Sequence, residues 1–132
     1  MKRDVSRRFP EEACGLLAGL GREVLEVVQI TNELHSRYRF RMEPGEQIRA
    51  LQSFEERGLE LIAIYHSHPH GPERPSATDV AEAAYPEAVN LIWSGQGGEW
   101  RCQGFLIRDG QVQGVKLTLT GHPDYRSNES NE

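Results

Sequence analysis

The chain has few cysteines, no long apolar run and no excess of basic residues. Two cysteines, Cys14 and Cys102, are too few for a disulfide scaffold and fit a reducing compartment. No apolar run approaches the roughly 20 residues that span a bilayer, and the polar N-terminus is no signal peptide. A net charge of −5 argues against nucleic-acid binding as the main role. We therefore expect a cytoplasmic protein whose partners are neither nucleic acids nor membranes.

What the chain does contain fits one folded domain. Its 132 residues, 37% of them hydrophobic, can bury a core without help from disulfides. Basic residues at the N-terminus are offset at once by Glu11 and Glu12, which predicts a solvated segment and not a binding arm. We expect the domain to cover residues 1–120, followed by a disordered polar tail over 121–132.

Apolar patterns separated by glycine predict more strands than helices. The expected strands are Gly15–Leu20, Glu23–Ile30, Tyr38–Met42, Leu59–Tyr65, Val89–Trp93, Trp100–Ile107 and Val112–Leu119. One helix begins at Pro44 and stops near Gly58, and a second runs from Ser76 to about Ala84. The mixed order predicts a single-domain α/β sandwich, in which helices flank one mixed, twisted sheet.

The sequence His66-Ser67-His68-Pro69, directly after an apolar strand, is the strongest functional signal. Residues i and i+2 of a strand share a face and lie roughly 6.5–7 Å apart, so two imidazoles there can close on one metal ion. Asp79, thirteen residues after His66, offers a third ligand. Two histidines and one carboxylate leave an open fourth position on a tetrahedral Zn²⁺, which is typical of a catalytic site.

The same residues have simpler interpretations. His66 and His68 can be polar residues at a strand end that are merely hydrogen-bonded. Ser76-x-x-Asp79 at a helix start is a capping box in its own right. The two roles are compatible, since Asp79 can bind a metal while the Ser76 hydroxyl turns toward a substrate. A hydrolytic site of this kind also needs a general base, and spacing alone does not choose among the glutamates.

Two segments together resemble one known family. The sequence Pro-Glu-Glu-Ala-Cys-Gly over residues 10–15, followed by His66-x-His68-Pro69 and then Ser76-x-x-Asp79, is similar to the JAMM (MPN+) zinc metallopeptidases. That family has Pro-x-Glu-x-x-Gly near the N-terminus, then His-x-His-Pro, then Ser-x-x-Asp. The order of expected elements agrees over Met1–Leu119. The resemblance implies a JAB1/MPN domain, whose fold is cytidine-deaminase-like.

The resemblance also implies roles for the matching residues. His66, His68 and Asp79 would hold one zinc ion per chain. Glu12 would be the general acid/base, with its neighbour Glu11 as the rival, and Ser76 would stabilise the oxyanion. Without the resemblance, Glu12 is simply a solvated acid. Cys14 has no spaced histidine partner, so we interpret it as a buried structural cysteine. Three further histidines are expected at the surface, with His70 nearest the site: His35, His70 and His122.

The absence of long insertions makes the chain similar to the small prokaryotic members. These imply cleavage of a peptide or isopeptide bond after the C-terminal Gly-Gly of a ubiquitin-like or sulfur-carrier protein. Two alternatives stay open: a zinc amidohydrolase acting on a small molecule or short peptide, and a non-catalytic MPN scaffold. Scaffold members generally lose ligand residues, whereas all three are present here. The oligomeric state also stays open, with a homodimer as one candidate.

Overall fold

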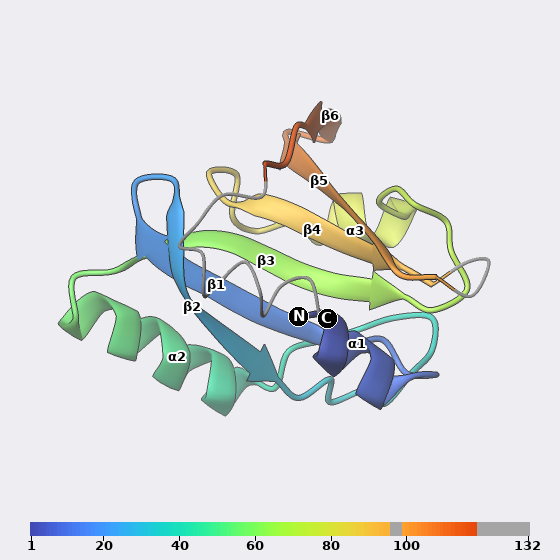
Figure 1. The fold of residues 1–132 in the computed structure, drawn as a ribbon, viewed down its shortest axis with the longest axis horizontal. Helices are drawn as coiled ribbons and strands as arrows, with labels where there is room; N and C mark the ends of the chain where they lie inside the picture. The colour runs from blue at the N-terminus through green and yellow to red at the C-terminus, as the bar shows by residue number, and fades with distance from the viewer. Residues whose placement is uncertain (96–98, 119–132) are drawn as a thin grey trace.

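The described part of the chain forms one six-stranded mixed sheet with three helices beside it (Figure 1). The structure, a computed structural model, describes residues 1–95 and 99–118. Helices are α1 (Lys2–Arg8), α2 (Pro44–Glu56) and α3 (Ala77–Ala81); strands are β1 (Cys14–Leu20), β2 (Glu23–Ile30), β3 (Glu60–His68), β4 (Val89–Ser94), β5 (Arg101–Arg108) and β6 (Gln111–Val115). This arrangement confirms the α/β architecture predicted from the sequence.

The strand β3 lies inside the sheet, whose order is β2-β1-β3-β4-β5-β6. It pairs antiparallel with β1 and parallel with β4, while the other neighbours are all antiparallel. The predicted hairpin of β1 and β2 is confirmed. Its turn contains Gly21 at φ +60°, a left-handed conformation that glycine adopts without a steric penalty. Backbone pairing on both sides therefore fixes the strand that carries the two histidines.

Each face of the sheet has its own core. On one face, Ala50 and Phe54 of α2 pack with Leu16 and Ile64. On the other face, Val5 of α1 belongs to a cluster that includes Leu17, Ala63 and Tyr65. Successive residues of a strand point to opposite faces, so positions 66 and 68 follow Ile64 onto the α2 face. The two histidines thus lie on the same face of the sheet as α2.

The N-terminal segment is more ordered than the sequence predicted. It forms α1, in which Asp4 and Val5 are buried at 1% and 0% exposure. Asp4 accepts hydrogen bonds from the Tyr65 hydroxyl and the Arg8 guanidinium, both at 2.6 Å. The expectation of a solvated segment was therefore wrong, because Asp4 is buried and forms an ion pair with Arg8.

Two further expectations need correction. The predicted strand Tyr38–Met42 is a loop with one isolated bridge, between Asn32 and Met42. The helix α3 ends at Ala81, before the predicted Ala84. The expected tail 121–132, with His122, lies outside the described residues. Among the residues that the structure describes, no helix is long and apolar enough to cross a bilayer.

Candidate metal centre

The two histidines lie at the C-terminal end of β3 and are almost fully buried. His66 is 2% exposed and His68 is 5% exposed. Their Nε2 atoms are 3.1 Å apart, so both rings turn toward the same point. In the sheet His66 lies between Cys14 of β1 and Ile92 of β4. The predicted convergence of the i and i+2 side chains is present in the structure.

Asp79 brings a third donor atom to that point. Its Oδ2 lies 3.1 Å from His66 Nε2 and 3.0 Å from His68 Nε2. Ligands at about 2.0–2.2 Å from a tetrahedral Zn²⁺ would be roughly 3.3–3.6 Å from one another. The three atoms form a slightly smaller triangle than this. The donor set therefore fits a zinc ion after a small outward movement of the side chains.

Hydrogen bonding and stacking orient the two rings. His68 Nδ1 lies 2.8 Å from the Pro72 carbonyl oxygen, to which it must donate, so the neutral form of the ring carries its lone pair on Nε2. Such a partner behind the ring is characteristic of a metal-ligating histidine. Phe40 stacks on His66 with ring centroids 4.5 Å apart and planes at 24°. His66 Nδ1 is buried and has no hydrogen-bond partner among the described residues.

The pKa values of the three residues shift in different directions. Burial lowers the pKa of His66, which favours the neutral imidazole that a metal requires. Burial alone would raise the pKa of Asp79, but hydrogen bonds from both histidines hold it well below its usual range. Burial also opposes protonation of His68, yet its contacts with Asp79 and Pro72 raise its pKa overall. Asp79 is thus an anion facing two imidazoles.

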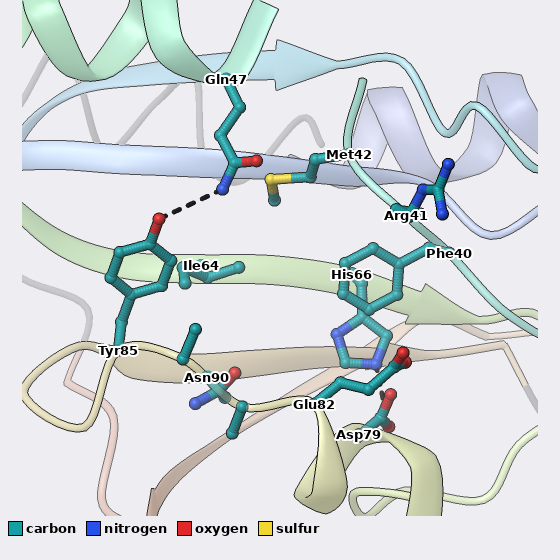
Figure 2. A pocket seen from close by; sticks show the side chains of 12 residues that line it. Phe40, Arg41, Met42, Gln47, Ile64, His66, Asp79, Glu82, Tyr85 and Asn90 are labelled. Carbon is teal, nitrogen blue, oxygen red and sulfur yellow. Dashed lines mark hydrogen bonds and ion pairs between the residues drawn. The ribbon is translucent and has the colours of Figure 1, made fainter. Parts of the chain in front are cut away.

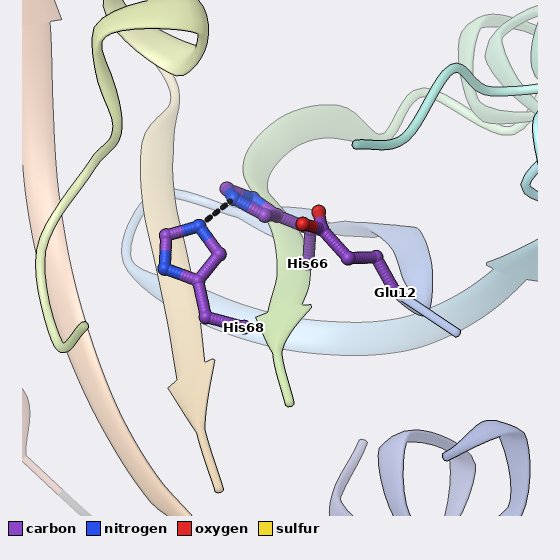
Figure 3. A group of neighbouring side chains, drawn as sticks. All are labelled: Glu12, His66 and His68. Carbon is purple, nitrogen blue, oxygen red and sulfur yellow. Dashed lines mark hydrogen bonds between the residues drawn. The ribbon is translucent and has the colours of Figure 1, made fainter. Parts of the chain in front are cut away.

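Glu12 is a second buried carboxylate beside the histidines (Figure 3). It is 4% exposed, and one of its oxygens lies within 4.8 Å of a ring nitrogen of each histidine. Burial raises the pKa of Glu12 to about 8, although His68 works against this shift. Two nearby carboxylates with opposite pKa shifts have different chemical capacities, because one stays ionised while the other can carry a proton.

Glu11, the rival by adjacency, lies apart from this cluster. Its side chain is 42% exposed and contacts His35 at 3.3 Å. The structure therefore brings Glu12, and not Glu11, to the two histidines. Glu12 also satisfies the geometry of a third metal ligand. Asp79 is the better candidate for that position, because its oxygen is closer to both rings and its pKa favours the anion.

Ser76 caps α3 as the sequence predicted. Its Oγ accepts from the Asp79 amide at 3.0 Å, and its own amide donates to Asp79 Oδ2 at 2.9 Å. This reciprocal pair is a capping box. A hydroxyl that accepts one hydrogen bond still has its hydrogen to donate. The cap therefore leaves the Ser76 hydroxyl able to act on a substrate.

A pocket of about 260 Å³ adjoins the cluster (Figure 2). Its lining comes from the loop 40–42, from α2, β3, α3 and β4, and from the segment that follows α3: Phe40, Arg41, Met42, Gln47, Ile64, His66, Asp79, Glu82, Ala83, Ala84, Tyr85 and Asn90. The sequence did not predict this pocket. The alternation of Phe40 with Met42 was a usable signal, but it was interpreted as a strand.

Cys14 and the histidines His35 and His70 lie where the sequence predicted them. Cys14 is 0% exposed, its Sγ donates to the Ile30 carbonyl at 3.4 Å, and burial raises its pKa to about 12. These properties confirm a structural cysteine. His35 is exposed, and so is His70, whose ring packs edge-on against Phe9 at 5.5 Å. Both are surface residues, as predicted.

Comparison with known proteins identifies the family. The model of the prokaryotic homologs of the JAB domain matches residues 1–104. The chain belongs to the prokaryotic JAB family. This agrees with the JAMM resemblance seen in the sequence, since all the residues of the cluster lie within the matched range.

Several relatives of this JAB-family chain have named activities. It is 39% identical to the "Probable TtuB-protein conjugate cleaving protease" of Thermus thermophilus, and the match covers 80% of this chain and 68% of that protein. It is 42% identical to a "Desampylase" of Pyrococcus furiosus, and the match covers 82% of this chain and 76% of that protein. It is 38% identical to the "CysO-cysteine peptidase" of Mycobacterium tuberculosis, and the match covers 67% of this chain and 62% of that protein.

A solved structure has the same fold. The solution structure of a protein from Desulfitobacterium hafniense superposes with a TM-score of 0.79 at 32% identity, and the match covers 93% of this chain and 88% of that one. A second, from Salinibacter ruber, gives a TM-score of 0.63 at 28% identity over 90% and 84% of the two chains.

Proposed function

We propose that this protein is a zinc-dependent peptidase or isopeptidase that hydrolyses the amide bond after the C-terminal Gly-Gly of a ubiquitin-like or sulfur-carrier protein. The observation that carries the proposal is the meeting of His66 Nε2, His68 Nε2 and Asp79 Oδ2 within 3.0–3.1 Å, beside the buried Glu12. The printed names of three relatives, a conjugate-cleaving protease, a desampylase and a CysO-cysteine peptidase, support the same reaction class.

In this proposal His66, His68 and Asp79 hold the zinc ion. When bound, zinc polarises the scissile carbonyl and lowers the pKa of water toward about 7. The surrounding residues fix the ligand atoms. Pro72 holds the tautomer of His68, and the Ser76 amide holds the oxygen of Asp79. This arrangement suits a site that must keep its geometry while a substrate enters and leaves.

Glu12 moves the proton. An ionised Glu12 accepts a proton from the attacking water, and the protonated acid then donates it to the leaving amine. In the metal-free protein, burial raises the pKa of Glu12 to about 8, and burial thereby favours the protonated state that donates to the leaving amine. The free hydrogen of the Ser76 hydroxyl is available to donate to the oxyanion that forms at the scissile carbonyl. These roles follow the positions that the JAMM resemblance assigned.

The substrate assignment depends on the size of the site. The pocket of about 260 Å³ is below the roughly 300–1,000 Å³ typical of small-molecule sites, so it fits a short stretch of extended polypeptide. A Gly-Gly tail has no side chains to clash with the buried cluster. The folded body of the carrier would remain outside. We expect the two glycines to be the main determinant of specificity.

A second candidate function uses the same site. The pocket beside the metal centre is partly open, so it could also admit a short peptide or the amide group of a small molecule, as in a zinc amidohydrolase. The two candidates share their chemistry and differ only in what occupies the site, so a comparison of substrates distinguishes them.

We also propose where the enzyme is located, which residues form its domain and how it assembles. We place the enzyme in the cytoplasm, since Cys14 and Cys102 are free thiols. Residues 1–120 would form the catalytic domain and 121–132 a dispensable tail, so truncation at 120 should preserve turnover. A homodimer remains one candidate for the oligomeric state, which sedimentation of the purified protein will decide.

The test uses a β-grasp carrier fused through its terminal glycine to a short peptide, with products identified by mass spectrometry. The zinc-loaded enzyme should cut directly after Gly-Gly, and a carrier with a bulky residue as its last residue should stay intact. Glu12→Gln is the matched inactive control. Equal cleavage of both carriers, or of unrelated unfolded peptides, would indicate a general peptidase. Turnover of a small amide without any cleavage of the fusion would favour the amidohydrolase.

A further inference from the structure

Asn32 is a buried amide whose hydrogen-bonding capacity is completely used. It is 2% exposed and lies two residues after the end of β2. Its Nδ2 donates to the carbonyls of Glu12 and Arg39, both at 3.0 Å, and its Oδ1 accepts from the amides of Leu34 and Arg41, both at 3.1 Å. A side-chain amide has two donor hydrogens and two acceptor lone pairs, and here all four are paired.

These four bonds join two parts of the site that are far apart in sequence. One donor hydrogen goes to the backbone of Glu12, and the other three bonds go to the loop over residues 34–41. The loop also binds Glu12 directly, because the Glu12 amide donates to the Ser36 carbonyl at 2.8 Å. Both backbone polar groups of Glu12 are therefore held by Asn32 or by the loop that Asn32 organises.

The loop also reaches the other side of the cluster. Asn32 holds the residues on either side of Phe40, namely the carbonyl of Arg39 and the amide of Arg41. Phe40 stacks on His66 and lines the pocket. One buried side chain thus sets the position of the carboxylate at one side of the histidines and of the aromatic ring at the other.

We propose that Asn32 is a positioning residue that acts through Glu12: it holds the general acid/base at the distance from the histidines that turnover requires. This inference rests on the role proposed for Glu12. A misplacement of about 1 Å in such a group can lower a rate by about 10²-fold. None of the four Asn32 bonds goes to a proposed zinc ligand, and its link to His66 passes only through the stacked ring of Phe40, so zinc should be retained without it.

The experiment combines Asn32→Ala and Asn32→Asp with Glu12→Gln. Asn32→Asp keeps the acceptor for Leu34 and Arg41 but removes both donor hydrogens, including the one that holds Glu12. Each variant is assayed for zinc content, and for kcat and KM on the carrier fusion. Ile107→Ala, a buried change in β5, is the control for lost stability alone. It should lower the melting temperature and keep its kcat.

We expect both Asn32 variants to retain zinc and to lose about 10²-fold in kcat, with KM changed less than threefold. In the Glu12→Gln background, Asn32→Ala should reduce kcat less than threefold further, because the group through which it acts is already gone. An undiminished kcat in the Asn32 variants, or the same fold loss in both backgrounds, would overturn the proposal.

Amide hydrogen exchange supplies a readout that does not depend on activity. Asn32→Ala should accelerate exchange at the amides of Glu12, Leu34 and Arg41. It should spare Ala13, whose amide donates to Ser67 Oγ at 2.7 Å. Unchanged exchange at Glu12 would overturn the positioning role. If the wild type fails to cut any carrier fusion, the proposed function is wrong, while accelerated exchange at Glu12 would still support the structural part of the inference.

Discussion

The Ser76 amide donates, at 2.9 Å, to the same Oδ2 atom of Asp79 that lies 3.0–3.1 Å from both histidines. One oxygen atom therefore belongs both to a helix cap and to the candidate metal centre. The cap fixes the first turn of α3 and, through it, the carboxylate. This relationship explains why a capping motif and a ligand motif occupy the same four residues, 76–79.

Ser76→Ala should affect stability and catalysis to different extents. Loss of the cap should lower the free energy of unfolding by about 1 kcal/mol. Loss of an oxyanion donor should lower kcat by about 10²–10³-fold. Thermal melts and turnover of the carrier fusion measure the two effects. Ser76→Thr, which keeps the hydroxyl, should recover most of both. A Ser76→Ala enzyme with normal kcat and only a lower melting temperature would reduce Ser76 to a cap.

Glu12 should make the metal-free protein less stable as the pH rises. Its pKa in the fold is about 8, raised mainly by burial, so the folded state keeps a proton that the unfolded chain has already released. Stability therefore falls between the ordinary pKa of glutamate, near 4.3, and about 8. Glu12→Gln removes this titration. The variant should melt progressively higher than the wild type as the pH rises from 5 toward 9.

Glu43 is the matched control for that pH series. Its carboxylate accepts from the amides of Glu46 and Gly45 at the start of α2, and these bonds lower its pKa. The sign is opposite, since its stabilisation is present at neutral pH and is lost as the pH falls through its pKa. Glu43→Gln should therefore melt lower than the wild type at pH 7. A Glu12→Gln variant without any pH-dependent gain would contradict the assignment of Glu12 as a buried proton carrier.

Gly15 should not tolerate a side chain. A Cβ at this position would collide with the ring of Tyr65 and with the Val28 carbonyl, whereas a Cβ at Gly114 would meet nothing within 4 Å. Gly15→Ala should lower the free energy of unfolding by about 1–3 kcal/mol. Gly114→Ala should change it by less than about 0.5 kcal/mol. Chemical denaturation measures both. Equal effects would mean that the close contact with Tyr65 is not a constraint on β1.

The sequence predicted the sheet and the ligand geometry because both depend on local patterns. Apolar runs revealed β1 and β3, partial alternation revealed β2, and the i, i+2 spacing placed His66 and His68 on one face. The choice of Glu12 over Glu11 was different in kind. It came from the family motif, and the burial that separates the two residues arises from tertiary packing.

What the sequence could not reveal depends on distant partners. Asp4 is polar and near the terminus, so nothing local indicates that Tyr65 and Arg8 would bury it. The residues around Phe40 alternate as a strand does, yet they form a loop because Asn32 binds their backbone groups in place of a neighbouring strand. A single side chain that replaces strand pairing leaves no periodic signal.

The central claim is that His66, His68 and Asp79 bind zinc while Glu12 performs the proton transfer. Turnover of the carrier fusion and zinc content, measured on the same samples of wild type, Glu12→Gln and His68→Ala, test it most directly. We predict that Glu12→Gln retains one zinc ion per chain and loses about 10²–10⁴-fold in kcat, while His68→Ala loses the metal. A fully active Glu12→Gln enzyme, or a His68→Ala variant with unchanged zinc affinity, would contradict the account.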